Sequence, residues 1–349
     1  MMAGSFRYVT PVAPQAATGR IAGVYAQLAN DFGLARMPVF LTLSPAEEVL
    51  AATWALLRES LLAGRAPRTG KEVVALGVSM ANRCPYCVAA HTTLLHATGE
   101  HRLGESIARG DTPEDPVHAA LLAWARGGGA PPFPAELAPE YVGTALAFHF
   151  INRIASALLT ENLLPANLQK SRLVRSVGGR AMARLVRRRL PPGASLPLIS
   201  GLPAGPEPAW AAGAPAGTAY AALRAVAESG GELLTDAARA LVRETVADWD
   251  GEHPPMGNAW LDGPLAALPD GGRAGARLAL LAALAPYRVT DADVAAWRGA
   301  RPDEDVAAWP GTRPDEDLVR LCAFGAITAT THAEPRLTAS TEAPLGDRS

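Results

Sequence analysis

The residues best suited to chemistry lie together in one short segment, residues 68–99. Cys84 and Cys87 form a C-x-x-C pair, with Glu72 before it and His91 after it. A thiolate that attacks a peroxide oxygen becomes a sulfenic acid, which a second thiol can convert to a disulfide. An imidazole and a carboxylate can move the protons that such a cycle requires. The segment therefore predicts a two-electron redox centre.

Two helices separated by a short break are expected to position these side chains. Residues 71–81 are mostly apolar and contain few turn formers, so they predict a helix, with Thr69 and Glu72 placed as a capping box. Proline suits the first position of a helix and disfavours helical geometry in the residue before it. A second helix is therefore predicted over residues 85–97, ended by Gly99.

The second helix brings the reactive groups onto one face. Cys84 is predicted to be its N-cap, with Cys87 in the first turn and His91 one turn further on. At about 100° per residue, these three positions return to the same side of the helix. The positive end of the helix favours a thiolate, and His91 could accept the thiol proton. Glu72 could hold the imidazole in one tautomer, as the third member of a nucleophile–base–orienter set.

These four residues resemble the E-x11-C-x-x-C-x3-H motif of alkylhydroperoxidase D-like proteins in the carboxymuconolactone decarboxylase superfamily, and the resemblance covers about residues 40–165. It implies an all-α fold, assembly into trimers or larger rings, and hydroperoxide reduction without a metal or organic cofactor. A dithiol partner, either a protein or a lipoyl-type group, would regenerate the enzyme. By this resemblance Cys87 is the peroxidatic thiol, Cys84 resolves it, and Glu72 and His91 form the proton relay. The decarboxylase branch lacks the cysteine pair, so decarboxylation is not the expected activity.

Two other functions use the same residues. A general thiol–disulfide oxidoreductase would act on disulfides instead of peroxides. A non-catalytic helical module could instead hold zinc with Glu72, Cys84, Cys87 and His91, since carboxylate, thiolate and imidazole are all zinc ligands. A purely structural disulfide is not expected, because cytosolic thiols are kept reduced.

Composition bounds the class of protein. The chain has a net charge of −2, 19% charged and 49% hydrophobic residues, which gives no case for nucleic-acid or membrane-surface binding and predicts extensive helix burial. The N-terminal residues lack the hydrophobic core of a signal peptide, and no apolar run reaches the length of a membrane span. We therefore predict a cytoplasmic protein.

The chain divides into four predicted parts. Residues 1–190 form the redox domain, 191–217 a proline- and glycine-rich linker, 218–333 a second helical domain, and 334–349 a disordered tail. Residues 276–298 repeat the outline of 71–93, an apolar helix, a Pro-Tyr break and another helix, so the second domain is predicted to be a degenerate, non-catalytic copy.

Three further features lie outside the predicted centre. The tandem repeat of 294–305 in 306–317 is expected to loop out. Cys322 is expected to be a buried apolar residue. His149, inside a predicted buried helix at 141–159, is expected either to pack in the core or to line the substrate pocket.

Overall fold

The computed structural model describes residues 6–34, 36–160, 176–177, 182–184, 186–299 and 314–339. Among these residues no β-strand forms, and the only extended pairings are two isolated bridges, Phe6 with Leu159 and Ala63 with Leu190. The all-α prediction is confirmed. No helix in the described ranges is long and apolar enough to cross a membrane.

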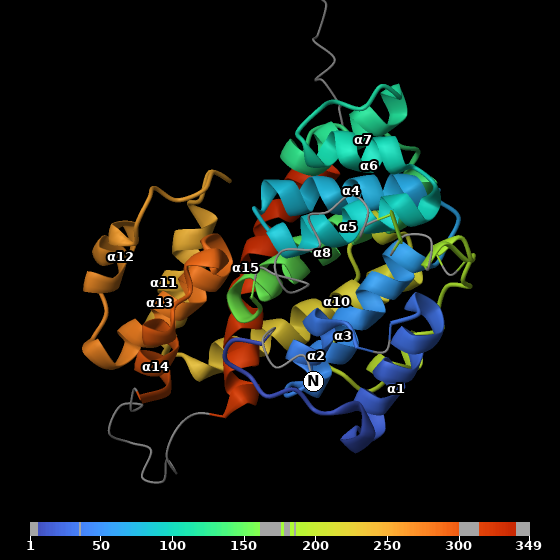
Figure 1. The fold of residues 1–349 in the computed structure, drawn as a ribbon. Helices are drawn as coiled ribbons and strands as arrows, with labels where there is room; N and C mark the ends of the chain where they lie inside the picture. Colours follow the sequence, from blue (N-terminus) through green and yellow to red (C-terminus); the bar gives the residue numbers. More distant parts are fainter. Residues whose placement is uncertain are drawn as a thin grey trace, which may run out of the picture.

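The chain forms the following helices, labelled in Figure 1. The first half contains α1 (Gly19–Gln27), α2 (Pro38–Leu43), α3 (Glu47–Leu57), α4 (Arg68–Ala81), α5 (Pro85–Thr98), α6 (His101–Ala108), α7 (Pro116–Gly127) and α8 (Ala138–Leu158). The second half contains α10 (Pro215–Glu228), α11 (Asp236–Ala247), α12 (Asp262–Ala266), α13 (Asp270–Leu284), α14 (Asp291–Gly299) and α15 (Asp315–Thr338).

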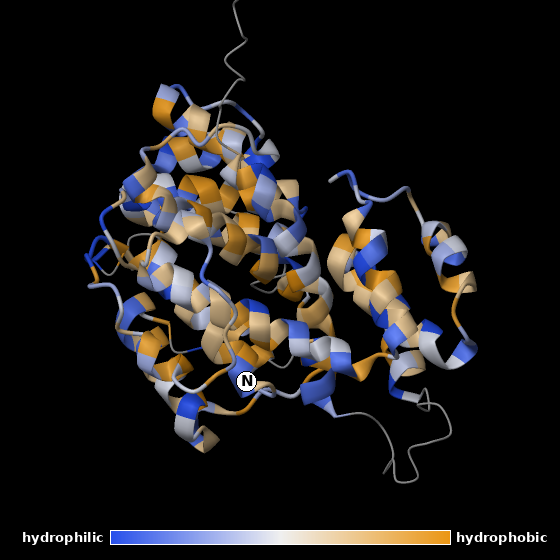
Figure 2. Cartoon of the chain, turned by 180° about the vertical axis from the view of Figure 1, so that it is seen from behind, coloured by the Kyte–Doolittle hydropathy of each residue, from blue (hydrophilic) through white to orange (hydrophobic). Residues whose placement is uncertain are grey.

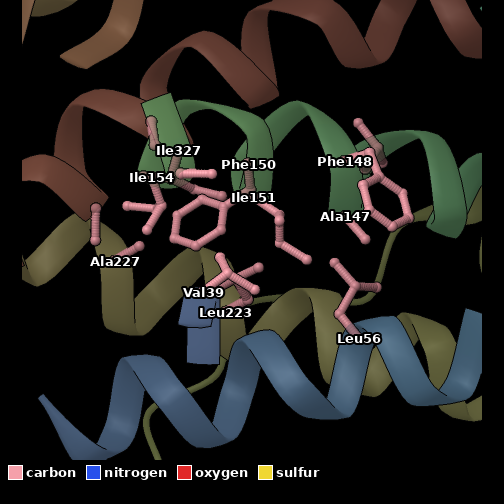
Figure 3. Packing of buried hydrophobic residues seen from close by; sticks show 14 of the residues in the cluster. Val39, Leu56, Ala147, Phe148, Phe150, Ile151, Ile154, Leu223, Ala227 and Ile327 are labelled. Atoms are coloured by element: carbon pink, nitrogen blue, oxygen red, sulfur yellow. The ribbon is translucent and has the colours of Figure 1, made fainter. Parts of the chain in front are cut away.

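Helix α8 is the central element of the first half, because it is apolar on nearly every side and must be covered all round. It packs against α4, α3 and α10, and against α15 along much of its length. Figure 3 shows Phe150 and Ile154 of α8 pointing toward Leu223 of α10 and Ile327 of α15. Apolar residues gather on the helix faces that meet one another, as Figure 2 shows. This packing fixes α8 as the wall against which α4 and α5 are set.

Helices α11 to α14 lie on the far side of α15 from α8 (Figure 1). Helix α13 packs on α15, is interrupted at Pro286 and is followed by α14, as α4 packs on α8, is interrupted before Pro85 and is followed by α5. The degenerate, non-catalytic second copy stays a prediction. The division of the chain at 191–217 stays a prediction, since helices from both sides of it pack together, α10 on α3 and α15 on α8.

The residues of the predicted linker are held in place by contacts with both halves of the chain. Glu59 accepts hydrogen bonds from the backbone N–H groups of Gly193 (2.6 Å) and Ser195 (3.0 Å), and its neighbour Arg58 forms a buried ion pair with Asp31 at 2.7 Å. Trp210 donates its indole N–H to Glu334 at 2.8 Å.

Helix α3 begins at Glu47, and Ser44 does not cap it, because the Ser44 hydroxyl donates to the carbonyl of Leu41 and accepts the N–H of Val12. The predicted start of the tail was wrong. Helix α15 runs to Thr338, so residues 334–338 are helical and do not belong to a disordered tail. Glu334 accepts hydrogen bonds from the indole N–H of Trp210 and from the hydroxyl of Tyr220 in α10, and these two contacts hold the last turns of α15 in place. Residues 340–349 and most of the tandem repeat lie outside the described residues.

Candidate active site

Helix α4 carries the acid of the site and begins earlier than the sequence predicted. Its N-cap is Pro67, whose extended backbone leads directly into a helix that starts at Arg68. Thr69 is already helical and caps nothing, so the predicted capping box was wrong. Glu72 does not turn back to the helix end, because its two oxygen atoms are bound by other side chains.

Helix α5 carries the two cysteines and the histidine, as predicted. Cys84 is the N-cap, and its Sγ accepts the backbone N–H of Cys87 at 3.4 Å. Pro85 occupies the first helical position. Gly99 ends the helix with a φ of +105°, a left-handed conformation that a residue without Cβ adopts at little cost.

Glu72 joins the two helices through a buried charged network. Its Oε2 lies 2.7 Å from His91 Nδ1, and its Oε1 accepts from Arg68 Nε at 2.7 Å. The glutamate is fully buried, and its residue is 0% exposed. Burial by itself raises the pKa of Glu72, but the charge of Arg68 and the hydrogen bond with His91 outweigh it, so the pKa is lowered. Glu72 is therefore a carboxylate, and its Oε2 accepts the Nδ1–H of His91.

The two sulfur atoms lie together at the start of α5. Cys84 Sγ and Cys87 Sγ are 2.7 Å apart, near enough to form a bond of about 2.05 Å with little movement. Both residues are buried, with 1% and 2% of their surface exposed. Burial raises the pKa of the Cys87 thiol well above its usual value, and the hydrogen bond with Cys84 raises it further. The thiolate expected for a helix N-terminus is thus opposed at Cys87 by desolvation, which the sequence pattern does not reveal.

His91 is close to the cysteines along the helix but forms no hydrogen bond with Cys87 among the described contacts. Its imidazole is 4% exposed and packs edge-on against the ring of Phe148, with centroids 4.3 Å apart and planes at 88°. The phenylalanine and Glu72 together fix the ring. A proton transfer between Cys87 and His91 therefore needs a small movement of the thiol or a bridging water.

A cavity of about 290 Å³ opens beside the first cysteine. Its wall includes Cys84 and Tyr86 of α5 and Leu159 at the end of α8, and it is completed by Arg7 and Tyr287. Arg7 donates to the carbonyl of Val289 at 2.7 Å, which places the N-terminal segment against the second half of the chain. Sequence analysis missed Arg7 and Tyr287. The only available signal for Tyr287 was its Pro-Tyr dipeptide, which repeats the one between the cysteines.

The remaining candidate residues lie away from the sulfurs. Cys322 is fully buried, as predicted, and burial raises the pKa of its thiol to about 12. His149 lines a different cavity, next to Arg153. Within the described part of the chain, no three His, Cys, Asp or Glu side chains are grouped so that they could hold a metal ion. Both carboxylate oxygens of Glu72, one of the four zinc ligands of the alternative prediction, are bound by Arg68 and His91.

Comparison with known proteins places this arrangement in a family. The model of the carboxymuconolactone decarboxylase family matches residues 47–126, which include all four predicted site residues. The alkyl hydroperoxide reductase Rv2159c of Mycobacterium tuberculosis is 42% identical over 299 residues, or 83% of this chain and 86% of the relative. No solved structure matches the chain. At this identity and coverage, and with the C-x-x-C centre at the start of a helix, the chain belongs to the carboxymuconolactone decarboxylase family as an alkylhydroperoxidase D-like protein.

Proposed function

We propose that this protein reduces organic hydroperoxides through a disulfide cycle between Cys84 and Cys87. The observation that carries the proposal is the pair of sulfurs 2.7 Å apart at the N-terminus of α5, one helical turn from a histidine held by a buried carboxylate. The activity in the name of the mycobacterial relative, alkyl hydroperoxide reductase, agrees with it.

In the first step, the Cys87 thiolate attacks the terminal oxygen of the hydroperoxide. The S–O bond forms as the O–O bond breaks, and the alkoxide leaves as an alcohol with a proton supplied through His91. In the second step, Cys84 attacks the sulfur of the Cys87 sulfenic acid. The S–S bond forms, the S–O bond breaks, and hydroxide leaves as water. An external dithiol then reduces the disulfide and is itself oxidised to a disulfide.

Glu72 would act through His91 and not on the peroxide. As an ionised acceptor for Nδ1–H, it directs the Nε2 lone pair toward the cysteines and stabilises the imidazolium that forms when His91 takes the thiol proton. Arg68 keeps that carboxylate ionised, which its contact at 2.7 Å and the lowered pKa of Glu72 support. Glu72 and Arg68 are thus positioning residues for the proton relay.

Two observations bear on which sulfur attacks. Cys87 is the cysteine one helical turn from His91, which supports its assignment as the attacking thiol. Cys84 is the cysteine that lines the 290 Å³ cavity, and it receives the N–H of Cys87, which favours the reverse order. We assign the attack to Cys87, since the proton acceptor lies on its side, and assign Cys84 to resolution at the cavity wall.

Stopped-flow mixing of the reduced protein with cumene hydroperoxide tests both the activity and the order. The parent should lose two thiols per peroxide, Cys84→Ser should react once and stop at a sulfenic acid that dimedone traps, and Cys87→Ser should be inert. Burst reactivity in Cys87→Ser with none in Cys84→Ser would reverse the order. An inert parent that nevertheless reduces a small disulfide substrate would replace the peroxidase with a thiol–disulfide oxidoreductase. A stoichiometric zinc ion in the purified protein would favour the non-catalytic module.

The reductant and the assembly follow from the family resemblance. We propose a dithiol protein or a lipoyl-type group as the electron donor, a homo-oligomeric assembly, and a cytoplasmic location. The recycling assay with a lipoyl-bearing protein, and the mass of the particle in solution, would test the first two directly.

A further inference from the structure

A second cavity, of about 90 Å³, is lined in part by Ala81 and Asn82, shortly before Cys84. Elements from both halves of the chain build it. Its wall is made by the ends of α4, α7 and α13, by α8 and α15, and by the loop after α11. The polar and aromatic side chains in that wall are Asn82, Arg126, His149, Arg153, Trp249, His253 and Arg336.

The cavity wall contains three arginines and no Asp or Glu side chain among the described lining residues. No described carboxylate forms an ion pair with Arg126, Arg153 or Arg336. Arg126 and Arg336 are exposed, whereas Arg153 is buried. A buried cation without a counter-ion is costly unless other partners replace its interaction with water. An excess of this kind indicates that a negative group can be accommodated there.

Arg153 is the centre of the cluster and is only 3% exposed. Its Nε donates to the carbonyl of Ala283 at 2.7 Å, and its Nη1 donates to the carbonyl of His149 at 2.6 Å. Its Nη2 makes no hydrogen bond with any residue in the described ranges. The free edge of a buried guanidinium, on a residue that lines the cavity, is a donor pair without a partner.

The two histidines that line the cavity take part in its hydrogen bonds as neutral rings, and neither supplies a negative charge that could pair with the arginines. His253 lies 2.8 Å from the carbonyl of Ala81 through Nε2, so this nitrogen carries the hydrogen. His149 Nδ1 faces Asn82 Nδ2 at 3.5 Å and Arg153 Nη1 at 3.4 Å, so it accepts and its hydrogen is on Nε2. The negative charge of Glu252 lies near His253, but Glu252 does not line the cavity.

The partial negative charges of nearby helix ends balance part of the positive charge of the arginine cluster, but not all of it. The C-termini of α4, α7 and α13 meet at the cavity, and each carries a partial negative charge of about one half. Three full positive charges exceed that sum, and Arg153 satisfies its helix-end carbonyl with Nε alone. The unpaired Nη2 remains available for a ligand.

We propose that this cavity binds a compact tetrahedral oxyanion, phosphate or a phosphoryl group, through Arg153 and Arg336. A cavity of about 90 Å³ has room for a five-atom anion. Arg153 supplies the buried fork, and Arg336, exposed at the mouth, supplies a second guanidinium that carries no carboxylate partner. Free phosphate and the phosphoryl group of a larger molecule share this chemistry, because the cavity is open at its mouth.

Isothermal titration of the full-length protein with inorganic phosphate, at constant ionic strength set with chloride, tests the site. One saturable site per chain is expected, with competition by sulfate. Arg336→Met should weaken phosphate binding by about tenfold or more. Arg153→Lys keeps the charge but removes the planar fork, and should weaken it similarly while the helical circular dichroism stays unchanged. Titration with glycerol 3-phosphate separates the sources, since tighter binding than phosphate identifies a phosphoryl group on a larger molecule and weaker binding identifies the free ion.

Arg109→Met is the matched control, because Arg109 is an exposed arginine paired with Asp111 at 3.0 Å outside this cavity. Its phosphate affinity should equal that of the parent. The inference is overturned if the parent shows no saturable binding, if Arg109→Met and Arg336→Met lose affinity equally, or if both Arg336→Met and folded Arg153→Lys bind as the parent does. In those cases the arginines serve only the helix-end carbonyls.

Discussion

Replacing Glu72 by Gln is the sharpest test of the proposed redox centre. The substitution keeps the size of the side chain and removes its charge. Glu72 now accepts from Arg68 and from His91, each at 2.7 Å. A neutral amide has one oxygen for two donors, so either Arg68 or His91 must face an N–H group.

Both stability and rate should fall, by different amounts. Breaking a fully buried ion pair costs about 3–5 kcal/mol, and because the Arg68 side chain is 16% exposed and partly solvated, we expect a loss of about 2–3 kcal/mol in the free energy of unfolding. Loss of control over the His91 tautomer should slow the reaction with cumene hydroperoxide by about 100-fold in the folded protein. Urea unfolding measures the first quantity, and stopped-flow thiol oxidation measures the second.

Glu140→Gln provides the matched control. Glu140 is also a buried carboxylate, which accepts from Lys71 at 2.7 Å and from the backbone N–H of Arg65 at 2.7 Å, but it does not contact the cysteines or His91. It should lose a similar amount of stability with an unchanged rate per folded molecule. Equal rates in Glu72→Gln and the parent, or equal slowing in the two variants, would refute the proposed relay.

Three further perturbations follow from the same structure. Phe148→Leu removes the edge-on ring contact with His91 and should slow peroxide reduction by several-fold, at a cost of about 1 kcal/mol in the free energy of unfolding. Phe150 is similarly buried but faces α10 and α15, so Phe150→Leu should cost similar stability without slowing the reaction. Identical kinetics of the two variants would contradict the role of the contact. Burial, together with nearby arginines, lowers the pKa of His149 to about 3, so the unfolded chain binds its proton first and stability should fall as pH drops below about 6.5, by about 1–2 kcal/mol at pH 5. His149→Gln should flatten that part of the pH–stability curve measured by urea unfolding, and an unchanged slope would count against a buried neutral imidazole. Gly99→Ala forces a residue with a Cβ into the left-handed conformation that ends α5, at a cost of about 1 kcal/mol, and should lower the midpoint of thermal unfolding. A midpoint equal to that of the parent would show that the cap does not stabilise the helix.

The sequence by itself determined the local chemistry of the centre. The spacing of Cys84, Cys87 and His91 around Pro85 dictates one helix face and an N-cap sulfur, because these follow from the helix period and from the backbone restrictions of proline. These features depend on residues within one or two turns of each other, where the chain has few alternatives. The all-α class was expected from the family resemblance, and the burial of Cys322 from the apolar character of a free cysteine.

Only the tertiary structure decided how the environment acts on those groups. Glu72 was expected to hold His91 and also to cap its own helix, but packing of α4 on α5 and α8 places it between His91 and Arg68, a partner that the sequence did not indicate. The raised pKa of Cys87 comes from burial under surrounding helices, and desolvation depends on neighbours that spacing cannot identify.

The second half of the chain illustrates the same limit at longer range. Tyr287 completes the cavity beside Cys84, and Arg336 meets Arg153 across a second cavity, although both pairs are separated by most of the chain. Their meeting depends on how α13 and α15 pack against α8. Spacing along a chain fixes which groups share a helix face, whereas contacts between distant segments are set by the packing of whole helices.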